Sequence, residues 1–196
     1  STLGPQFMNN AKKSMEAFEL VIEDEAELSG IPEGAIEAAK IAADEKGYDG
    51  KWLFTLDFPS YLPVIQYADN RNIREKIWRA MATRAWSKDG QGEYDNAANA
   101  KRIANLRFER ANLLGYKTHA HYVLEHRMAE KPETVLEFLD KLKNAYKPAA
   151  QKDLQELKTF AKDLDSMDDL KPWDATYYSE KLKQKLFEFS SEDLRP

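Results

Sequence analysis

The nine residues THAHYVLEH, positions 118 to 126, contain every histidine of the chain together with one glutamate. His121 and Glu125 are four residues apart, so on a helix their side chains share one face, as two helical metal ligands do. His119 and His126 project in other directions on the same helix. A third metal ligand would therefore have to come from another segment, and the chain has no further histidine and no cysteine to supply it.

Two interpretations of this segment follow from its residues. In one, His121 and Glu125 hold a metal ion together with a ligand from elsewhere in the chain. In the other, the segment is an ordinary helix whose histidines make polar contacts or lie at the surface. The helical zinc-peptidase signature H-E-x-x-H has two histidines four apart with a glutamate beside the first, and that order is not found here. The second interpretation is therefore favoured.

The segment from Asn70 to Trp86 is rich in basic side chains, although the formal net charge of the chain is −5. The basic residues are Arg71, Arg74, Lys76, Arg79 and Arg84, and Glu75 is the one acidic residue among them. A guanidinium group binds a carboxylate through two parallel hydrogen bonds, so this stripe could recognise the C-terminus of a peptide. The alternative is a solvated face with ion pairs inside the helix, such as Glu75 with Arg79. Charged helix faces are more often of this second kind.

The remaining polar and aromatic residues provide no reacting group. Six aromatic residues could line a cleft, but their spacing is more typical of core packing: Trp52, Phe54, Tyr61, Trp173, Tyr177 and Tyr178. The acidic runs EDEAE and DSMDD lack the apolar surroundings that would shift a carboxyl pKa. The chain has no phosphate-binding glycine loop and no GxSxG sequence. We therefore expect no catalytic, no cofactor-binding and no metal-binding residue in this chain.

The composition excludes several classes of protein. Without cysteine there is no disulfide framework, thiolate metal site or cysteine nucleophile. The acidic charge argues against general nucleic-acid binding, which requires a positive surface. No apolar run is long enough to span a membrane. The opening residues STLGPQFMNN lack the basic and apolar regions of a signal peptide.

Helical periodicity dominates and predicts a mainly α fold, a multi-helical array with at most one short strand or hairpin near residues 51–57. Apolar residues at three- and four-residue steps predict a first helix over residues 6–28. We expect a helical hairpin over 1–50, a strand and turn over 51–67, and a helical array over 70–189. Seven helices should follow the first: one from Pro32 to Gly47, one ending near Tyr67, one capped by Asn70, one from Asp95 or Asn96 to about Leu114, one opened by Thr118, one from Pro132 to about Leu164 with a kink at Pro148, and one capped by Asp174.

Two long stretches of the sequence resemble a known family of enzymes. They are FTLDFPSYLPVIQYADNRNIREKIWRAMATRA and NLRFERANLLGYKTHAHYVLEHRMAEKPETVLEFLDKL. Both are similar to the thimet-oligopeptidase and peptidyl-dipeptidase family of zinc metallopeptidases, in which LLGY, Ala120 with Tyr122, RMA and VLEFL occur in this order and spacing. WDATYY and the final LRP also resemble family positions. The resemblance covers nearly the whole chain, most strongly from about Lys51 to Leu142, and bacterial peptidyl-dipeptidases (dipeptidyl carboxypeptidases) look most similar.

This resemblance implies an almost entirely helical fold in two halves around a deep channel that admits short peptides. It also implies one zinc ion, held by the two histidines of H-E-x-x-H and a downstream glutamate, with the motif glutamate as general base. The chain contains no HE dipeptide. No catalytic or metal residue of the family can therefore be assigned to any position here, and we expect the zinc motif beyond the position that corresponds to Pro196.

The chain is thus predicted to be an amino-proximal, non-catalytic helical portion of a zinc peptidase, with both ends cut from a longer polypeptide. Its expected partners are the catalytic half of that polypeptide and, in the intact enzyme, short peptides, but neither nucleic acid nor membrane. Alone it should be inactive, and it should dimerise through exposed apolar surface. The intact enzyme would be cytoplasmic, or periplasmic if a signal peptide precedes this sequence. The alternative is a stand-alone helical binding or scaffold module without catalysis.

Overall fold

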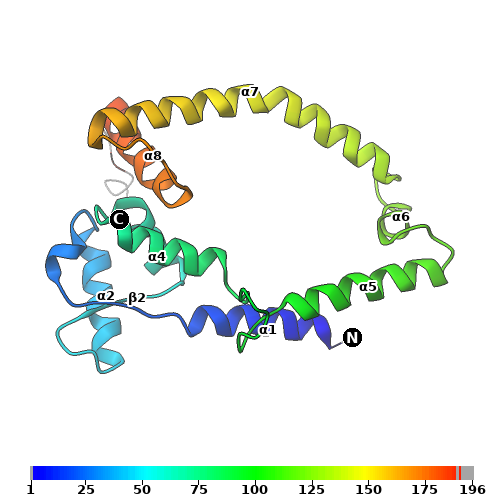
Figure 1. Cartoon of the computed structure of the whole chain (residues 1–196), viewed down its shortest axis with the longest axis horizontal. Coiled ribbons are helices and arrows are strands. Elements are labelled where there is room, and N and C mark those ends of the chain that lie inside the picture. The colour runs from blue at the N-terminus through cyan, green and yellow to red at the C-terminus, as the bar shows by residue number, and fades with distance from the viewer. Residues whose placement is uncertain (1, 189, 191–196) are drawn as a thin grey trace. The chain divides into compact units, whose positions relative to one another are not determined.

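The computed structural model describes residues 2–188 and 190, and this part of the chain is mainly helical (Figure 1). The elements in chain order are α1 (Leu3–Glu16), β1 (Leu20–Ile22), the 3-10 helix η1 (Glu25–Leu28), α2 (Glu33–Glu45), β2 (Trp52–Phe54), α3 (Phe58–Tyr67), α4 (Arg71–Ala82), α5 (Ala97–Leu113), α6 (His119–Leu124), α7 (Pro132–Asp165) and α8 (Pro172–Phe187). The predicted mainly α fold with one short hairpin is confirmed. No helix of the described residues is long and apolar enough to cross a lipid bilayer.

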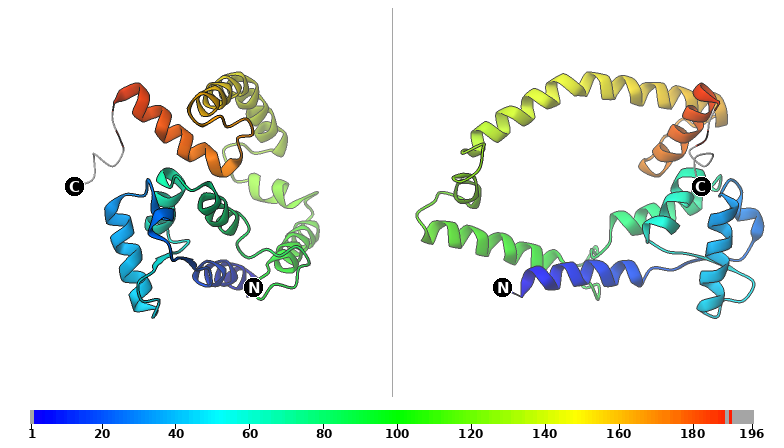
Figure 2. Two further views of the ribbon diagram at one scale, coloured as in Figure 1. Left: turned by 60° about the vertical axis from the view of Figure 1, so that its left-hand side comes forward. Right: turned by 180° about the vertical axis from the view of Figure 1, so that it is seen from behind.

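The chain forms two compact units. The first, here called the α5–α6 unit, comprises Ser1–Asn10 and Trp86–Gln155, and the second, the core unit, comprises Ala11–Ala85 and Glu156–Pro196. The boundaries between the units fall inside α1 and α7, so each of these helices contributes residues to both. The two additional views show α7 as one continuous helix (Figure 2).

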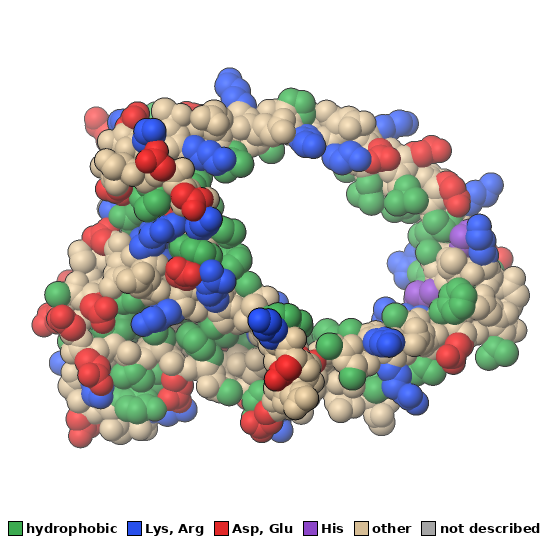
Figure 3. All heavy atoms as spheres, viewed as in Figure 1, with side chains coloured by type: hydrophobic (Ala, Val, Ile, Leu, Met, Phe, Trp, Pro, Cys, Tyr) green, Lys and Arg blue, Asp and Glu red, His purple; other side chains and the backbone are tan. Residues whose placement is uncertain are grey.

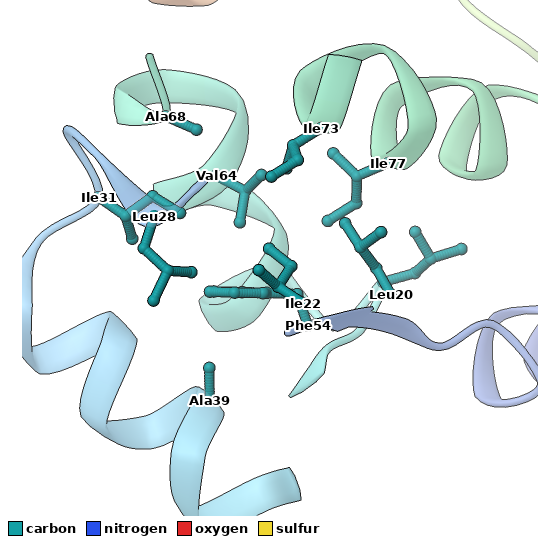
Figure 4. Close-up of a cluster of buried hydrophobic side chains, with 11 residues drawn as sticks. Leu20, Ile22, Leu28, Ile31, Ala39, Phe54, Val64, Ala68, Ile73 and Ile77 are labelled. Atoms are coloured by element: carbon teal, nitrogen blue, oxygen red, sulfur yellow. The ribbon is translucent and has the colours of Figure 1, made fainter. Parts of the chain in front are cut away.

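The hydrophobic centre of the core unit is built around a two-stranded antiparallel sheet. β1 pairs with β2 in the register Leu20 with Phe54 and Ile22 with Trp52. The side chains of α2, α3 and α4 close over this sheet (Figure 4). The buried members are Leu20, Ile22, Leu28, Ile31, Ala39, Phe54, Leu56, Val64, Ala68, Ile73 and Ile77. Removal of this apolar surface from water supplies the main driving force for folding of the unit.

A second hydrophobic cluster in the same unit joins the end of α7 to α8. Its buried members are Leu157, Phe160, Ala161, Tyr177 and Tyr178. The α8 helix also packs against α3 and α4. The helix α8 is thereby held to elements that lie about a hundred positions earlier in the sequence.

The first predicted helix is wrong in its second half. The helix α1 ends at Glu16, and Leu20–Ile22 form a strand instead of a further helical turn. Ile22 fits the three- and four-residue steps that extend from Phe18, but Leu20 and Ile22 also alternate along a strand and are both buried against the partner strand. A short apolar segment is compatible with either period, and here tertiary pairing decides between them.

The other predicted helices are present with small shifts at their ends. Asn70 caps α4 as expected, because its side chain accepts a hydrogen bond from the backbone N–H of Asn72. Thr118 begins α6, and α7 continues through Pro148 as far as Asp165. The prediction that Asp174 caps the last helix is wrong. The cap residue is Lys171, and Asp174 lies in the first turn, where its carboxylate accepts a hydrogen bond from the Lys171 backbone N–H.

Candidate functional site

The most elaborate polar site in the described residues lies where α4 meets α8 in the core unit. The carboxylate of Asp174, on α8, is fully buried and accepts hydrogen bonds from two arginines of α4. Arg71 donates from Nε and Nη2, with a shortest distance of 2.7 Å, and Arg74 donates from Nη2 at 3.0 Å. The Lys171 backbone N–H is a further donor at 3.0 Å. These donors occupy both oxygens of the carboxylate.

The charge of Asp174 is stabilised despite its burial. Burial on its own would raise the pKa of Asp174, because a desolvated carboxylate is costly. The hydrogen bonds from Arg71, the Lys171 backbone and Arg74 outweigh burial, and the pKa of Asp174 lies below its ordinary value. Arg74 is buried as well, and its Nη1 donates to the carbonyl oxygens of Ala68 and Asp69. The group is therefore a buried ion pair that holds the end of α3, the start of α4 and the start of α8 together.

Two tyrosines of α8 extend this network. The Tyr177 hydroxyl donates to Asp69 Oδ1 at 2.8 Å, and the Tyr178 hydroxyl donates to Asp165 Oδ2 at 3.0 Å. Burial, followed by the hydrogen bond to Asp165, raises the pKa of Tyr178 to about 12. Burial and the bond to Asp69 raise the pKa of Tyr177 further. Both phenols are thus neutral hydrogen-bond donors near neutral pH.

An open hollow of about 490 Å³ borders this network, and its lining mixes cations, carboxylates and phenols. The carboxylates of Asp69, Asp165 and Asp174 each accept from a partner in the network. Among the described residues that line the hollow there is no serine or histidine, and so no nucleophile paired with a base. The contacts of this arrangement fasten helices together.

Each of the two interpretations of the basic stripe on α4 describes some of its residues. Glu75 and Arg79 form the expected ion pair at 2.7 Å on the solvent side. Arg71 and Arg74 do bind a carboxylate, as the carboxylate-recognition interpretation requires, but that carboxylate belongs to Asp174 of the same chain. Sequence reasoning missed Asp174 as their partner because it assigned this residue to a helix cap. The clustering of arginines in an acidic chain was the signal in the sequence that indicated a carboxylate-binding site.

The histidine segment forms α6, and its expected ligands do not converge. His121 Nδ1 shares a hydrogen bond of 2.8 Å with Thr118 Oγ1, while Glu125 accepts from the Tyr116 hydroxyl. His126 is exposed and lies 3.7 Å from Glu125. His121, Glu125 and His126 thus each have a local polar contact, as the ordinary-helix interpretation expects, whereas Nδ1 of His119 has no hydrogen-bond partner in the described part of the chain. Among the described residues no group of three or more histidine, aspartate or glutamate side chains is placed to hold a metal ion, so these residues do not fit a zinc site.

The aromatic residues pack as core, as the sequence favours. Phe54, Trp173, Tyr177 and Tyr178 are buried, and Trp52 and Tyr61 pack against the central cluster. Trp173 also lies 5.7 Å from Trp78 between ring centroids, with the guanidinium of Arg79 4.7 Å from its ring. These contacts add to the attachment of α8 to α4.

Comparison with known proteins gives this helical chain a family. A model of peptidase family M3 matches residues 64–196, which is more than half of the chain. Oligopeptidase A of Haemophilus influenzae is 46% identical over 198 residues, covering 100% of this chain and 29% of that protein. Oligopeptidase A of Escherichia coli K12 is 45% identical with the same coverage, and dipeptidyl carboxypeptidase of Escherichia coli K12 is 30% identical over 100% of this chain and 28% of that protein.

The chain thus spans 29% of the length of the oligopeptidases that it matches. Its identity to oligopeptidase A exceeds its identity to dipeptidyl carboxypeptidase of the same bacterium, 45% against 30%. The family match begins in α3 and includes the helices that hold both the Asp174 network and the histidine segment. The resemblance to the zinc oligopeptidases and peptidyl-dipeptidases is confirmed, and the chain belongs to peptidase family M3.

Proposed function

We propose that this chain is a non-catalytic helical portion of a zinc-dependent peptidase that hydrolyses short peptides, either an oligopeptidase or a peptidyl-dipeptidase. The observation that carries the proposal is the 46% identity to an oligopeptidase A along the entire chain, which corresponds to only 29% of that protein. The chain's role is to form part of the wall of the substrate channel and to support the catalytic half. Residues 1–196 then act as one helical piece of a larger enzyme.

The zinc ligands and the general base are assigned to the remainder of the polypeptide. Two features support this division. The sequence contains no HE dipeptide, and the described residues offer no ligand set for a metal. The intact enzyme would contain one zinc ion and act in the cytoplasm, or in the periplasm if a signal peptide precedes this sequence.

The decisive experiment compares this chain with the longer polypeptide. The coding sequence is read past the codon for Pro196, and both products are purified and assayed with zinc on an internally quenched peptide of about ten residues. We expect an H-E-x-x-H sequence downstream, chelator-sensitive cleavage by the longer product, and none by residues 1–196. Zinc-dependent turnover by residues 1–196 would overturn the assignment of catalysis to the remainder. A stop codon after Pro196 would favour the stand-alone binding module.

Apolar side chains on α7 support a covering partner. Leu139 and Tyr146 are 51% and 67% exposed, and together with Leu142 they follow one face of the helix at i, i+3 and i+7. Since the chain spans 29% of its relatives, we assign the remainder of the polypeptide as the occupant of this face. Without that remainder, residues 1–196 should dimerise through it. Light scattering during gel filtration should show a concentration-dependent dimer that Leu139→Lys abolishes and Lys141→Glu, on the opposite face of α7, does not. A parent chain that stays monomeric at high concentration would contradict this.

A further inference from the structure

The α5–α6 unit contains an open hollow of about 630 Å³ that the proposed function does not use. Its apolar lining comes from Leu3 of α1 and from Ile103 and Leu106 of α5, and its polar lining comes from Arg107, Arg110 and His119. Small-molecule sites occupy roughly 300–1,000 Å³ and combine apolar walls with a few placed polar groups. The size and the lining of this hollow match that description. Figure 3 shows histidine atoms in this part of the surface with basic and hydrophobic side chains beside them.

The hollow carries uncompensated positive charge. None of the described residues that line it is acidic. Within residues 2–188 and 190, neither Arg107 nor Arg110 forms an ion pair with a carboxylate, although the chain as a whole has a net charge of −5. The guanidinium of Arg110 lies 5.0 Å from the ring centre of Tyr122, a cation–π contact that restricts its position. Two neighbouring cations without an internal partner form an anion-binding surface.

A third polar group at this hollow also lacks a partner. His119 is half-buried, and its Nδ1 is shielded from solvent without a hydrogen-bond partner in the described part of the chain. Its ring lies 6.3 Å from that of Tyr122. A shielded polar atom without a hydrogen bond destabilises the folded state, because it has lost its hydrogen bonds to water. A bound ligand with an oxygen atom would remove this destabilisation.

The apolar lining restricts which anion fits. Leu106 is 40% exposed, and Leu3 and Ile103 are half-buried. An apolar group that covers these three side chains gains from their removal from water, whereas a bare inorganic anion gains nothing there. Guanidinium groups match the planar geometry of a carboxylate. The favoured ligand therefore joins a carboxylate to an apolar group.

We propose that this hollow binds a carboxylate carried on an apolar group, namely the C-terminal residue of a short peptide with an aliphatic side chain. The carboxylate lies against Arg107 and Arg110, and the side chain lies on Leu3, Ile103 and Leu106. The choice of a peptide over another apolar acid rests on the proposed peptidase function. The carboxylate site itself rests only on the hollow and its charges.

The test uses residues 1–196 and two matched probes, acetyl-Gly-Gly-Leu with a free carboxylate and the same peptide as its C-terminal amide. Binding is followed by amide chemical shifts in a titration at low salt. The free acid should bind at least tenfold more tightly than the amide. Arg107→Gln and Arg110→Gln should each weaken binding of the acid about tenfold. Arg110→Lys should retain more affinity than Arg110→Gln, which separates loss of charge from loss of fold.

Arg102→Gln is the matched control, because Arg102 lies on α5 among the residues of a different hollow. It should leave the affinity within twofold. Equal binding of acid and amide, or equal affinity of the Arg107→Gln variant and the parent, would overturn the site.

A third probe, hexanoate, distinguishes the C-terminus of a peptide from a simple apolar acid as the source of the carboxylate. If hexanoate binds as tightly as the peptide and depends on the same arginines, the site takes apolar acids in general and its assignment to peptides is overturned. Weaker binding of hexanoate supports the peptide. If residues 1–196 bind none of the probes but the longer polypeptide cleaves peptides, this inference alone is rejected. If residues 1–196 bind the peptide but the longer polypeptide cleaves nothing, the proposed function alone is rejected.

Discussion

Arg74 and Asp174 are separated by 100 positions in the chain, and their side chains meet at 3.0 Å with 2% and 0% of their surface exposed. A buried pair of this kind is destabilised strongly when one member is lost, because the other charge stays buried without compensation. Loss of either residue is therefore expected to weaken the attachment of α8 to α4. The effect can be measured as a change in the free energy of unfolding after a single substitution.

The substitution Asp174→Asn should lower the free energy of unfolding by about 3–5 kcal/mol, since Arg74 would keep its charge in a buried environment. Urea unfolding followed by circular dichroism measures the change. The control is Glu75→Gln, which removes an ion pair whose side chains are 59% and 32% exposed and should cost less than about 1 kcal/mol. Similar small losses for the two variants would contradict the importance of the buried pair.

Stability should fall in acid because the pKa values of Asp69 and Asp174 are both below the ordinary 3.8 in the folded state. Burial raises the pKa of Asp69, but hydrogen bonds from Ser29 and Tyr177 and the proximity of Lys181 outweigh it. The folded state therefore binds fewer protons than the unfolded state, and its advantage is complete above pH 3.8 and lost as the pH falls through the folded values.

Urea midpoints measured between pH 2 and pH 6 test this expectation. The parent should lose stability steadily below about pH 4. Asp69→Asn should show a shallower decline, because one of the two carboxylates no longer titrates. An identical slope for the parent and the variant would exclude Asp69 as a contributor.

The stability of the folded state at alkaline pH depends on Tyr178, whose pKa is raised from 10.0 to about 12 by burial and by the hydrogen bond to Asp165. The folded state favours the protonated phenol, so this contribution is complete below pH 10 and is lost as the pH rises toward 12. Tyr178→Phe should flatten the decline of stability between pH 10 and pH 12. Tyr146→Phe, at a position that is 67% exposed, should leave the slope unchanged, and equal slopes for parent and Tyr178→Phe would disprove the assignment.

Gly30 should not tolerate a side chain. Its φ is +83°, and an added Cβ would lie 2.3 Å from the carbonyl oxygen of Tyr67. Gly30→Ala should cost about 2–4 kcal/mol from backbone strain and overpacking combined. Gly47→Ala shares the positive φ, at +78°, but meets nothing within 4 Å, so it should cost about 1 kcal/mol. Thermal unfolding compares the stability of the two variants. Equal losses of stability would show that the Tyr67 carbonyl does not add to the cost of a side chain at Gly30.

Residues 1–196 should bind no stoichiometric zinc. His121 and Glu125 are the residues at ligand spacing, but their side chains contact Thr118 and Tyr116 instead of a common centre. Equilibrium dialysis with metal analysis should give well below one zinc per chain, and the value should be unchanged in His121→Ala. One zinc per chain, lost in His121→Ala, would restore the metal interpretation of this segment.

The helices could be predicted from the sequence because each carries its own local signals, such as Asn70 before α4 and Thr118 before α6. The strand Leu20–Ile22 could not, because its residues also continue the helical spacing of the preceding segment, and pairing with β2 decides between the two structures. The same limit applies to the site. The arginines of α4 were visible as a cluster, but nothing near them in the sequence indicates that their carboxylate partner is Asp174, 100 positions later.

The separation between Arg74 and Asp174 has a consequence for the growing chain. Protein synthesis proceeds at roughly 5–20 residues per second, so the 100 positions between them correspond to roughly 5–20 s of translation. During that interval α4 has been synthesised, while the carboxylate that neutralises its arginines has not yet been made. The nascent chain must keep these guanidinium groups hydrated and separate from the apolar cluster, and closure of the core unit is delayed until α8 emerges.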